Sequence, residues 1–154
     1  MGDEPVLDPE RERTLAVELY NRVWTLLDDV SSPERQDEVV HCAHASAWHW
    51  SRVGTTQNRA IGEWQLSRVY AVLDRAEPAR HHAHRAHDLA QEVGDVPWLV
   101  ASAYEALAMA YAVAGGREQA RLWRDRAVEA LDAVEDPEDR AVVEGDIASL
   151  PDLA

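Results

Sequence analysis

Two stretches, VYAVLDRAEPAR (residues 69–80) and AYAVAGGREQAR (residues 110–121), decide the predicted fold of this chain. They align without a gap, which places Tyr70 on Tyr111. In both cases an alanine follows the tyrosine nine residues later, and another follows sixteen residues later, just beyond the quoted stretch. Similarity at a fixed period is the signature of stacked supersecondary units, each burying one face on its neighbour.

A weaker match at nearly the same offset extends the repetition toward the N-terminus. It lays His41 and His44 over His81 and His84, and residues 52–54 over residues 92–94. Apolar residues recur every three or four positions, which predicts helices, and no segment alternates as a strand does. The expected helices span residues 9–30, 33–53, 58–73, 77–93, 97–114, 118–134 and 137–149.

Capping residues support these boundaries. A polar N-cap precedes a proline at Asp8, Ser32 and Asp136, where the missing proline N–H costs nothing. Glycines with a left-handed backbone commonly end helices, and Gly54 and Gly94 lie where two helices should stop. Asp95 with Pro97 should then begin the next helix.

These observations predict an all-α domain over residues 1–154, a short stack of about three helical hairpins with a C-terminal capping helix. The hairpins are residues 8–53, which are degenerate, then 58–93 and 97–134, and the cap is 137–149. The set of small residues and tyrosine resembles the tetratricopeptide repeat (TPR), in a variant found in bacterial regulators whose period, about 40 residues, is longer than usual. The matching positions are Ser67, Tyr70, Ala79 and Ala86, then Leu107, Ala108, Tyr111, Gly115, Ala120 and Ala127.

Composition narrows the class of protein. Hydrophobic residues make up 46% and charged residues 29% of the chain, which is typical of a globular domain. The net charge is −14, so we expect no nucleic-acid partner, because such binding needs clustered cations. The single cysteine, Cys42, fits a reducing, cytoplasmic setting. The N-terminal stretch MGDEPVLDPERER has no apolar core and no membrane-spanning segment is found, so neither export nor membrane insertion is expected.

The resemblance implies a concave groove lined by the first helix of each hairpin, which binds a peptide in that family. Its positions here are Trp64, Arg68, Glu105 and Met109. Arg68 would grip a carboxylate and Trp64 would supply contact area. The alternative is that Arg68 and Glu105 form an ion pair between neighbouring helices while Trp64 packs.

A second candidate is a tryptophan-lined pocket that would place a histidine and a glutamate as acid and base, with the residues His44, His49, Trp50, Glu63 and His82. Histidines three residues apart share a helix face, so His41, His44, His81 and His84 are candidate ligands for a divalent metal. The alternative for these histidines is packing or a solvated helix face. No other cofactor is expected, because the sequence contains no catalytic or nucleotide-binding motif.

The sequence therefore favours a protein- or peptide-binding scaffold without catalytic activity. A small metal-dependent or His/Glu-based enzyme or ligand-binding protein is the alternative, and a homodimer remains open.

Overall fold

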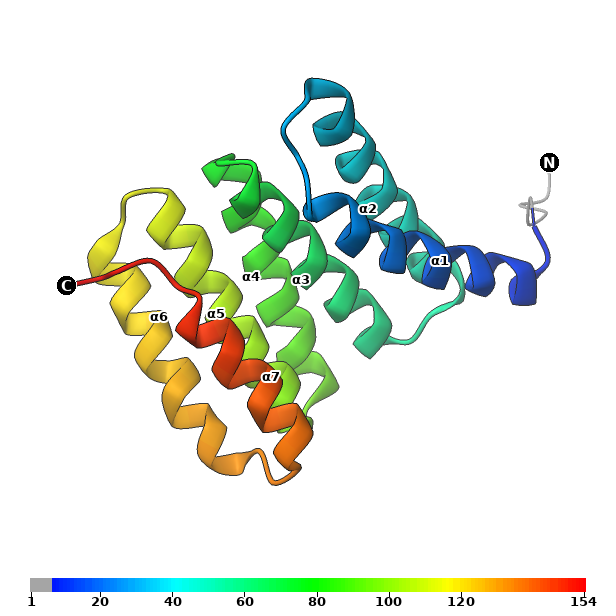
Figure 1. Ribbon diagram of the computed structural model, residues 1–154. Coiled ribbons are helices and arrows are strands. Elements are labelled where there is room, and N and C mark those ends of the chain that lie inside the picture. The colour runs from blue at the N-terminus through cyan, green and yellow to red at the C-terminus, as the bar shows by residue number, and fades with distance from the viewer. Residues whose placement is uncertain (1–6) are drawn as a thin grey trace.

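The computed structural model describes residues 7–154, and these form seven α-helices and one 3₁₀ turn without a strand (Figure 1). The predicted all-α fold is confirmed. Residues 1–6, part of the N-terminal stretch considered above, lie outside the described range. The helices are α1 (Pro9–Leu27), α2 (Pro33–Val53), α3 (Thr56–Val72), α4 (Ala76–Val93), α5 (Pro97–Val113), α6 (Arg117–Ala130) and α7 (Pro137–Ala148), with the 3₁₀ turn at Leu131–Ala133.

The three predicted polar N-caps are confirmed. Asp8 accepts hydrogen bonds from two backbone N–H groups of α1, Asp136 does the same for α7, and Ser32 accepts one from Arg35. These bonds satisfy donors that a helix leaves free in its first turn. Each of these three helix starts is thus capped by a side chain next to it in the sequence.

Two predictions about capping residues are wrong, although α2 ends at Val53 and α5 begins at Pro97 as expected. Gly54 has φ −91°, so it is not left-handed, and a Cβ there would lie 2.6 Å from the carbonyl oxygen of Trp50. Glycine is needed at this position for close approach rather than for a positive φ. Val96, not Asp95, is the N-cap of α5, and its side chain makes no capping bond. Gly94, by contrast, has φ +91° as expected.

Consecutive helices pack as three hairpins, α1 with α2, α3 with α4, and α5 with α6. The hairpins stack through α2 on α3 and α4 on α5, while α3 also contacts both α1 and α5. The repeated alanines Ala79, Ala86, Ala120 and Ala127 are almost completely buried. Small side chains let neighbouring helix backbones approach closely, which is the packing that the sequence repeat predicts.

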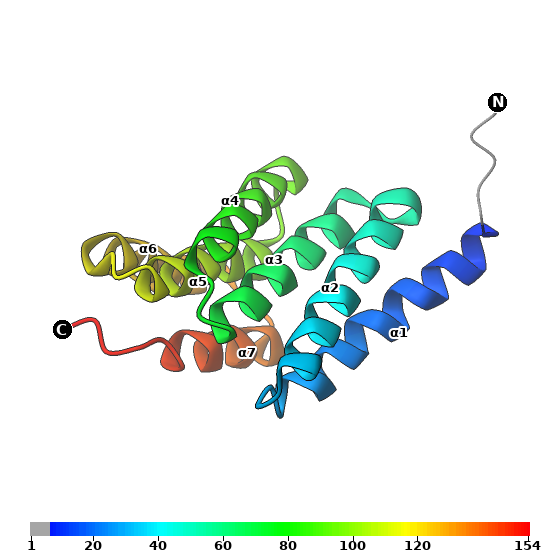
Figure 2. The same ribbon diagram turned by 90° about the horizontal axis from the view of Figure 1, so that it is seen from above.

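The C-terminal helix α7 packs on α5 and α6. Its Val143 is 1% exposed and lies in a cluster with Ala101 and Leu131. Seen from above, α7 lies on the same side of the stack as α1, opposite α4 (Figure 2). It therefore lies over the face formed by α1, α3 and α5, which we call the inner face.

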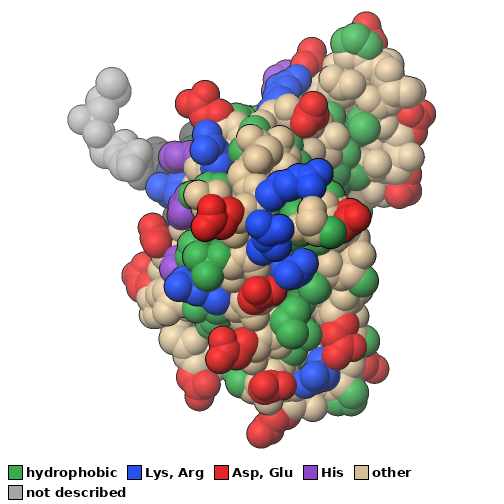
Figure 3. Space-filling view, turned by 90° about the vertical axis from the view of Figure 1, so that its left-hand side faces the viewer, with side chains coloured by type: hydrophobic (Ala, Val, Ile, Leu, Met, Phe, Trp, Pro, Cys, Tyr) green, Lys and Arg blue, Asp and Glu red, His purple; other side chains and the backbone are tan. Residues whose placement is uncertain are grey.

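Basic side chains gather in the middle of the face shown in Figure 3, with acidic side chains around them. In α6, Arg117 donates a hydrogen bond to the backbone carbonyl of Ala154 and Arg121 donates one to that of Leu153, both at 2.9 Å. These arginines thus hold the C-terminal segment against the last hairpin.

Among the described residues, no helix combines the length and the apolar character needed to cross a membrane.

Candidate functional site

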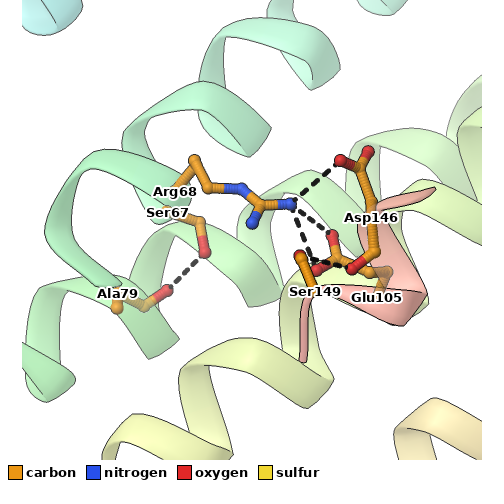
Figure 4. Close-up of polar contacts among 6 residues, drawn as sticks. All are labelled: Ser67, Arg68, Ala79, Glu105, Asp146 and Ser149. Carbon is orange, nitrogen blue, oxygen red and sulfur yellow. Dashed lines mark hydrogen bonds and ion pairs between the residues drawn. The ribbon is translucent and has the colours of Figure 1, made fainter. Parts of the chain in front are cut away.

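Arg68 of α3 contacts two carboxyl groups on the inner face (Figure 4). Its Nη2 atom donates to Oε1 and Oε2 of Glu105 on α5, at 3.2 and 3.1 Å, and lies 3.5 Å from Oδ1 of Asp146 on α7. Glu105 is completely buried. The ion pair expected as an alternative to an open groove is therefore present, and Asp146 joins it from a helix outside the repeat.

Burial dominates the electrostatics of this cluster. It raises the pKa of Glu105 to about 7, against the lowering effect of Arg68, while the Asp146 carboxylate raises that pKa further. Burial also raises the pKa of Asp146, again opposed by Arg68. One guanidinium faces two carboxyl groups, and it does not fully replace the hydration that both have lost. The cluster joins α3, α5 and α7. Arg68, which was predicted to bind a ligand carboxylate, is already paired within it.

The other two predicted groove residues, Trp64 and Met109, lie in different surroundings. The ring of Trp64 lies under the Arg68 guanidinium at 5.7 Å and beside the ring of Trp24 at 5.6 Å. The buried Nε1 atom of Trp64 makes no hydrogen bond of good geometry within residues 7–154, but it lies near enough to Glu105 to favour the ionised carboxylate. Met109 packs against the core between the second and third hairpins. Only Trp64 of the four lines the cavity described next.

A cavity of about 240 Å³ opens on the inner face between the helix stack and α7. Its walls are mostly apolar and come from four helices. They are Tyr20, Ile61, Trp64, Trp98, Leu99 and Ser102 on α1, α3 and α5, and Asp139, Val142, Val143 and Asp146 on α7. Val142 is 64% exposed at its rim, although it is apolar. We call this hollow between the stack and α7 the aromatic cavity.

Two further hollows adjoin the aromatic cavity. One shares Tyr20 and Ile61 with it and adds Trp50. The other, of about 520 Å³, shares Trp98 and Asp139, and four of its eight lining residues are acidic. The shared residues make both hollows neighbours of the aromatic cavity, and carboxylates are concentrated in the one beside Trp98.

The predicted His/Glu pocket is only partly assembled. His82 Nδ1 lies 2.6 Å from Oε2 of Glu63, and the rings of His44 and His82 are 5.5 Å apart. His49 instead pairs with Glu12 of α1 at 3.1 Å. Trp50 lines the separate hollow described above. His44, Glu63 and His82 line none of these hollows, so a substrate site around them gains no support from the geometry.

Within residues 7–154, no three His, Cys, Asp or Glu side chains are placed to hold a metal ion. The predicted ligands His44 and His84 are instead hydrogen-bonded to tyrosines, with His44 Nε2 2.7 Å from Tyr70 Oη and His84 Nε2 2.9 Å from Tyr111 Oη. The predicted ligands His41 and His81 are exposed. The same histidine-to-tyrosine contact recurs between successive hairpins, which indicates that His44 and His84 serve packing between repeats.

Sequence reasoning did not identify Tyr20, Trp98 or any residue of α7 as part of a site. Tyr20 lies in the degenerate first hairpin and α7 was expected only to cap the stack, so no spacing rule joined them to Trp64. Six tryptophans in 154 residues were the available signal, since aromatic residues in excess of the core often mark binding surfaces.

A scan against protein-family models, a search of curated proteins and a search of solved structures each find no match. The resemblance to the tetratricopeptide repeat thus stays a prediction from the sequence.

Proposed function

We propose that this protein is a binding module that holds a segment of another polypeptide on its inner face. The observation that carries this proposal is the aromatic cavity, with Tyr20, Trp64 and Trp98 around an open apolar space. Tyrosine and tryptophan are enriched in the residues that dominate binding energy at protein interfaces. The tetratricopeptide resemblance supports the same face, because that family binds peptides on it.

The size of the cavity favours a side chain as its occupant. Sites for drug-sized molecules and cofactors commonly measure about 300–1,000 Å³. The aromatic cavity, at about 240 Å³, is smaller and suits one large apolar side chain. The rest of the partner segment would then lie along the neighbouring hollows. Such anchoring by one side chain is how many protein interfaces gain most of their affinity.

The electrostatics of the inner face argue against a carboxylate as the main recognition element. Arg68, the predicted carboxylate grip, is already paired with Glu105 and Asp146. A ligand carboxylate would have to displace Asp146 or share the guanidinium with two acids. The partner is therefore expected to be recognised by apolar contact at the cavity.

Filling the cavity from within the chain tests the proposal. Ser102 lies in the cavity wall and is 9% exposed, so Ser102→Leu places an apolar side chain where the partner side chain would enter. A library of random dodecapeptides displayed on phage is panned on the wild-type protein, and the selected peptides are measured by calorimetry. We expect Ser102→Leu to weaken their binding at least about tenfold, the effect of losing one anchoring side chain.

The matched control is Ala141→Leu, which adds the same side chain to an exposed position of α7 that does not line the cavity. It should bind the peptides as the wild type does. Circular dichroism should show that both variants keep their helices. Selected peptides that bind Ser102→Leu with wild-type affinity, or a library that yields no binder at all, would show that the cavity is not a recognition site.

A further inference from the structure

The hollow beside the aromatic cavity is acidic. Four carboxylates surround it, from Asp95 before α5 and from Glu135, Asp136 and Asp139 at the start of α7. It measures about 520 Å³ and shares the Trp98 ring with the aromatic cavity. We call this hollow the acidic bay.

The four acids of the bay are exposed and have no ionic partner among the described residues, whereas acids that are mostly buried in this chain are paired. Within residues 7–154, Glu12, Glu63 and Glu105 each pair with an arginine, whereas none of the four bay carboxylates lies within ion-pair distance of an arginine or histidine. A negative potential therefore remains in the acidic bay.

The starts of α5 and α7 reduce that potential without cancelling it. Each helix N-terminus is equivalent to roughly half a positive charge. Two such ends offset about one of the four negative charges, and one oxygen of Asp136 is further used to cap α7. About three negative charges remain beside the apolar cavity, in a chain whose net charge of −14 reinforces the attraction of cations.

We infer that the partner segment carries an arginine or lysine close to the apolar side chain that enters the aromatic cavity, and that this cation occupies the acidic bay. The inference rests on the proposed function and names the chemistry of the partner. The two hollows share Trp98 and Asp139, so anchor and cation lie close together in the partner sequence, separated by no more than a few positions.

The alternative is that the four acids of the bay serve only to cap helices and keep the chain soluble. In that case the partner segment would show no preference for a flanking charge. The distinction is measurable, because charge complementarity changes which partners are selected as well as how tightly they bind.

The phage library of random peptides described above provides the test, with the sequences of the selected peptides as the first readout. We expect enrichment of a large apolar residue together with arginine or lysine one to four positions away. An enriched apolar residue without an enriched cation overturns the inference and leaves the proposed function standing. Selection of no apolar residue removes the proposed function itself.

Calorimetry on the best peptide provides the second readout. Replacing its arginine or lysine with glutamine should weaken binding to the wild type about fivefold, since exposed ion pairs contribute up to about a factor of five each. The same replacement should change little for the double variant Glu135→Gln/Asp139→Asn. The control Glu34→Gln/Asp37→Asn, which removes two exposed charges on α2, should keep the full fivefold effect. Equal effects in both double variants would mean that the cation lies elsewhere.

Discussion

Ionisation of Glu105 opposes folding, and the substitution Glu105→Gln isolates this effect. Glutamine has nearly the same shape, keeps an oxygen that accepts from Arg68, and carries no charge. Arg68 keeps Asp146 as its ionic partner in the variant. The substitution therefore removes one titration from the inner face with little change in packing.

The expected magnitude follows from the raised pKa. Burial raises the pKa of Glu105 from 4.5 to about 7, so the folded protein prefers the neutral carboxyl. For an acid with a raised pKa, stability is highest below the unfolded value and is lost as the pH rises through the folded value. One pKa unit corresponds to about 1.4 kcal/mol, which makes the full loss roughly 3 kcal/mol, of which about 2–3 kcal/mol falls between pH 5 and pH 8.

Urea unfolding followed by circular dichroism at pH 5, 6, 7 and 8 measures this loss. The free energy of unfolding of Glu105→Gln, relative to wild type, should rise by about 2–3 kcal/mol across that range. This difference corresponds to roughly 5–10 °C in melting temperature. Comparison with wild type cancels the titration of groups common to both proteins.

Glu129→Gln, at an exposed position of α6, is the control and should give a curve parallel to wild type. Parallel curves for Glu105→Gln and wild type from pH 5 to pH 8 would refute the reasoning. They would mean that Arg68 keeps Glu105 ionised throughout, so that attraction outweighs the loss of hydration.

Two glycines give opposite predictions for the same change to alanine. Gly54→Ala should lower the free energy of unfolding by about 1–3 kcal/mol, because the new Cβ would lie 2.6 Å from the Trp50 carbonyl oxygen. Gly145→Ala, inside α7 with nothing within 4 Å of the new Cβ, should raise it by about 0.5–1 kcal/mol through helix propensity. Urea unfolding checks both; a neutral Gly54→Ala or a destabilising Gly145→Ala would contradict the respective local geometry.

The helices could be predicted closely from the sequence because their signals are local. Asp8, Ser32 and Asp136 act within their own first turns. The errors arise where a boundary depends on a neighbour. Thr55 and Asn58 form a capping box that starts α3 earlier than the apolar pattern indicates, and Gly54 is dictated by the backbone of the preceding helix.

The candidate site could be predicted only in part, because it too depends on contacts between neighbouring elements rather than on local sequence signals. The register of the repeat placed Arg68 and Glu105 on neighbouring helices, and their ion pair follows from it. The repeat carries no information about α7, which lies outside it. Asp146, which completes the ion pair, and Val142, which rims the aromatic cavity, therefore could not be placed beside α3 from spacing alone.

Comparison of the second and third hairpins separates contacts that recur between repeats from features that do not. Glu63 and His82 pair between α3 and α4, and the equivalent positions of the next hairpin are Tyr104 and Trp123, whose rings stack 5.8 Å apart between α5 and α6. The same contact is thus made once by an ion pair and once by two aromatic rings, so its role is to join the helices of a hairpin and its chemistry is interchangeable. The aromatic cavity has no such equivalent, because α7 forms one of its walls and is not repeated. A feature that packing between repeats does not explain is the better candidate for a function, so the inner face is favoured over the histidines of α2 and α4.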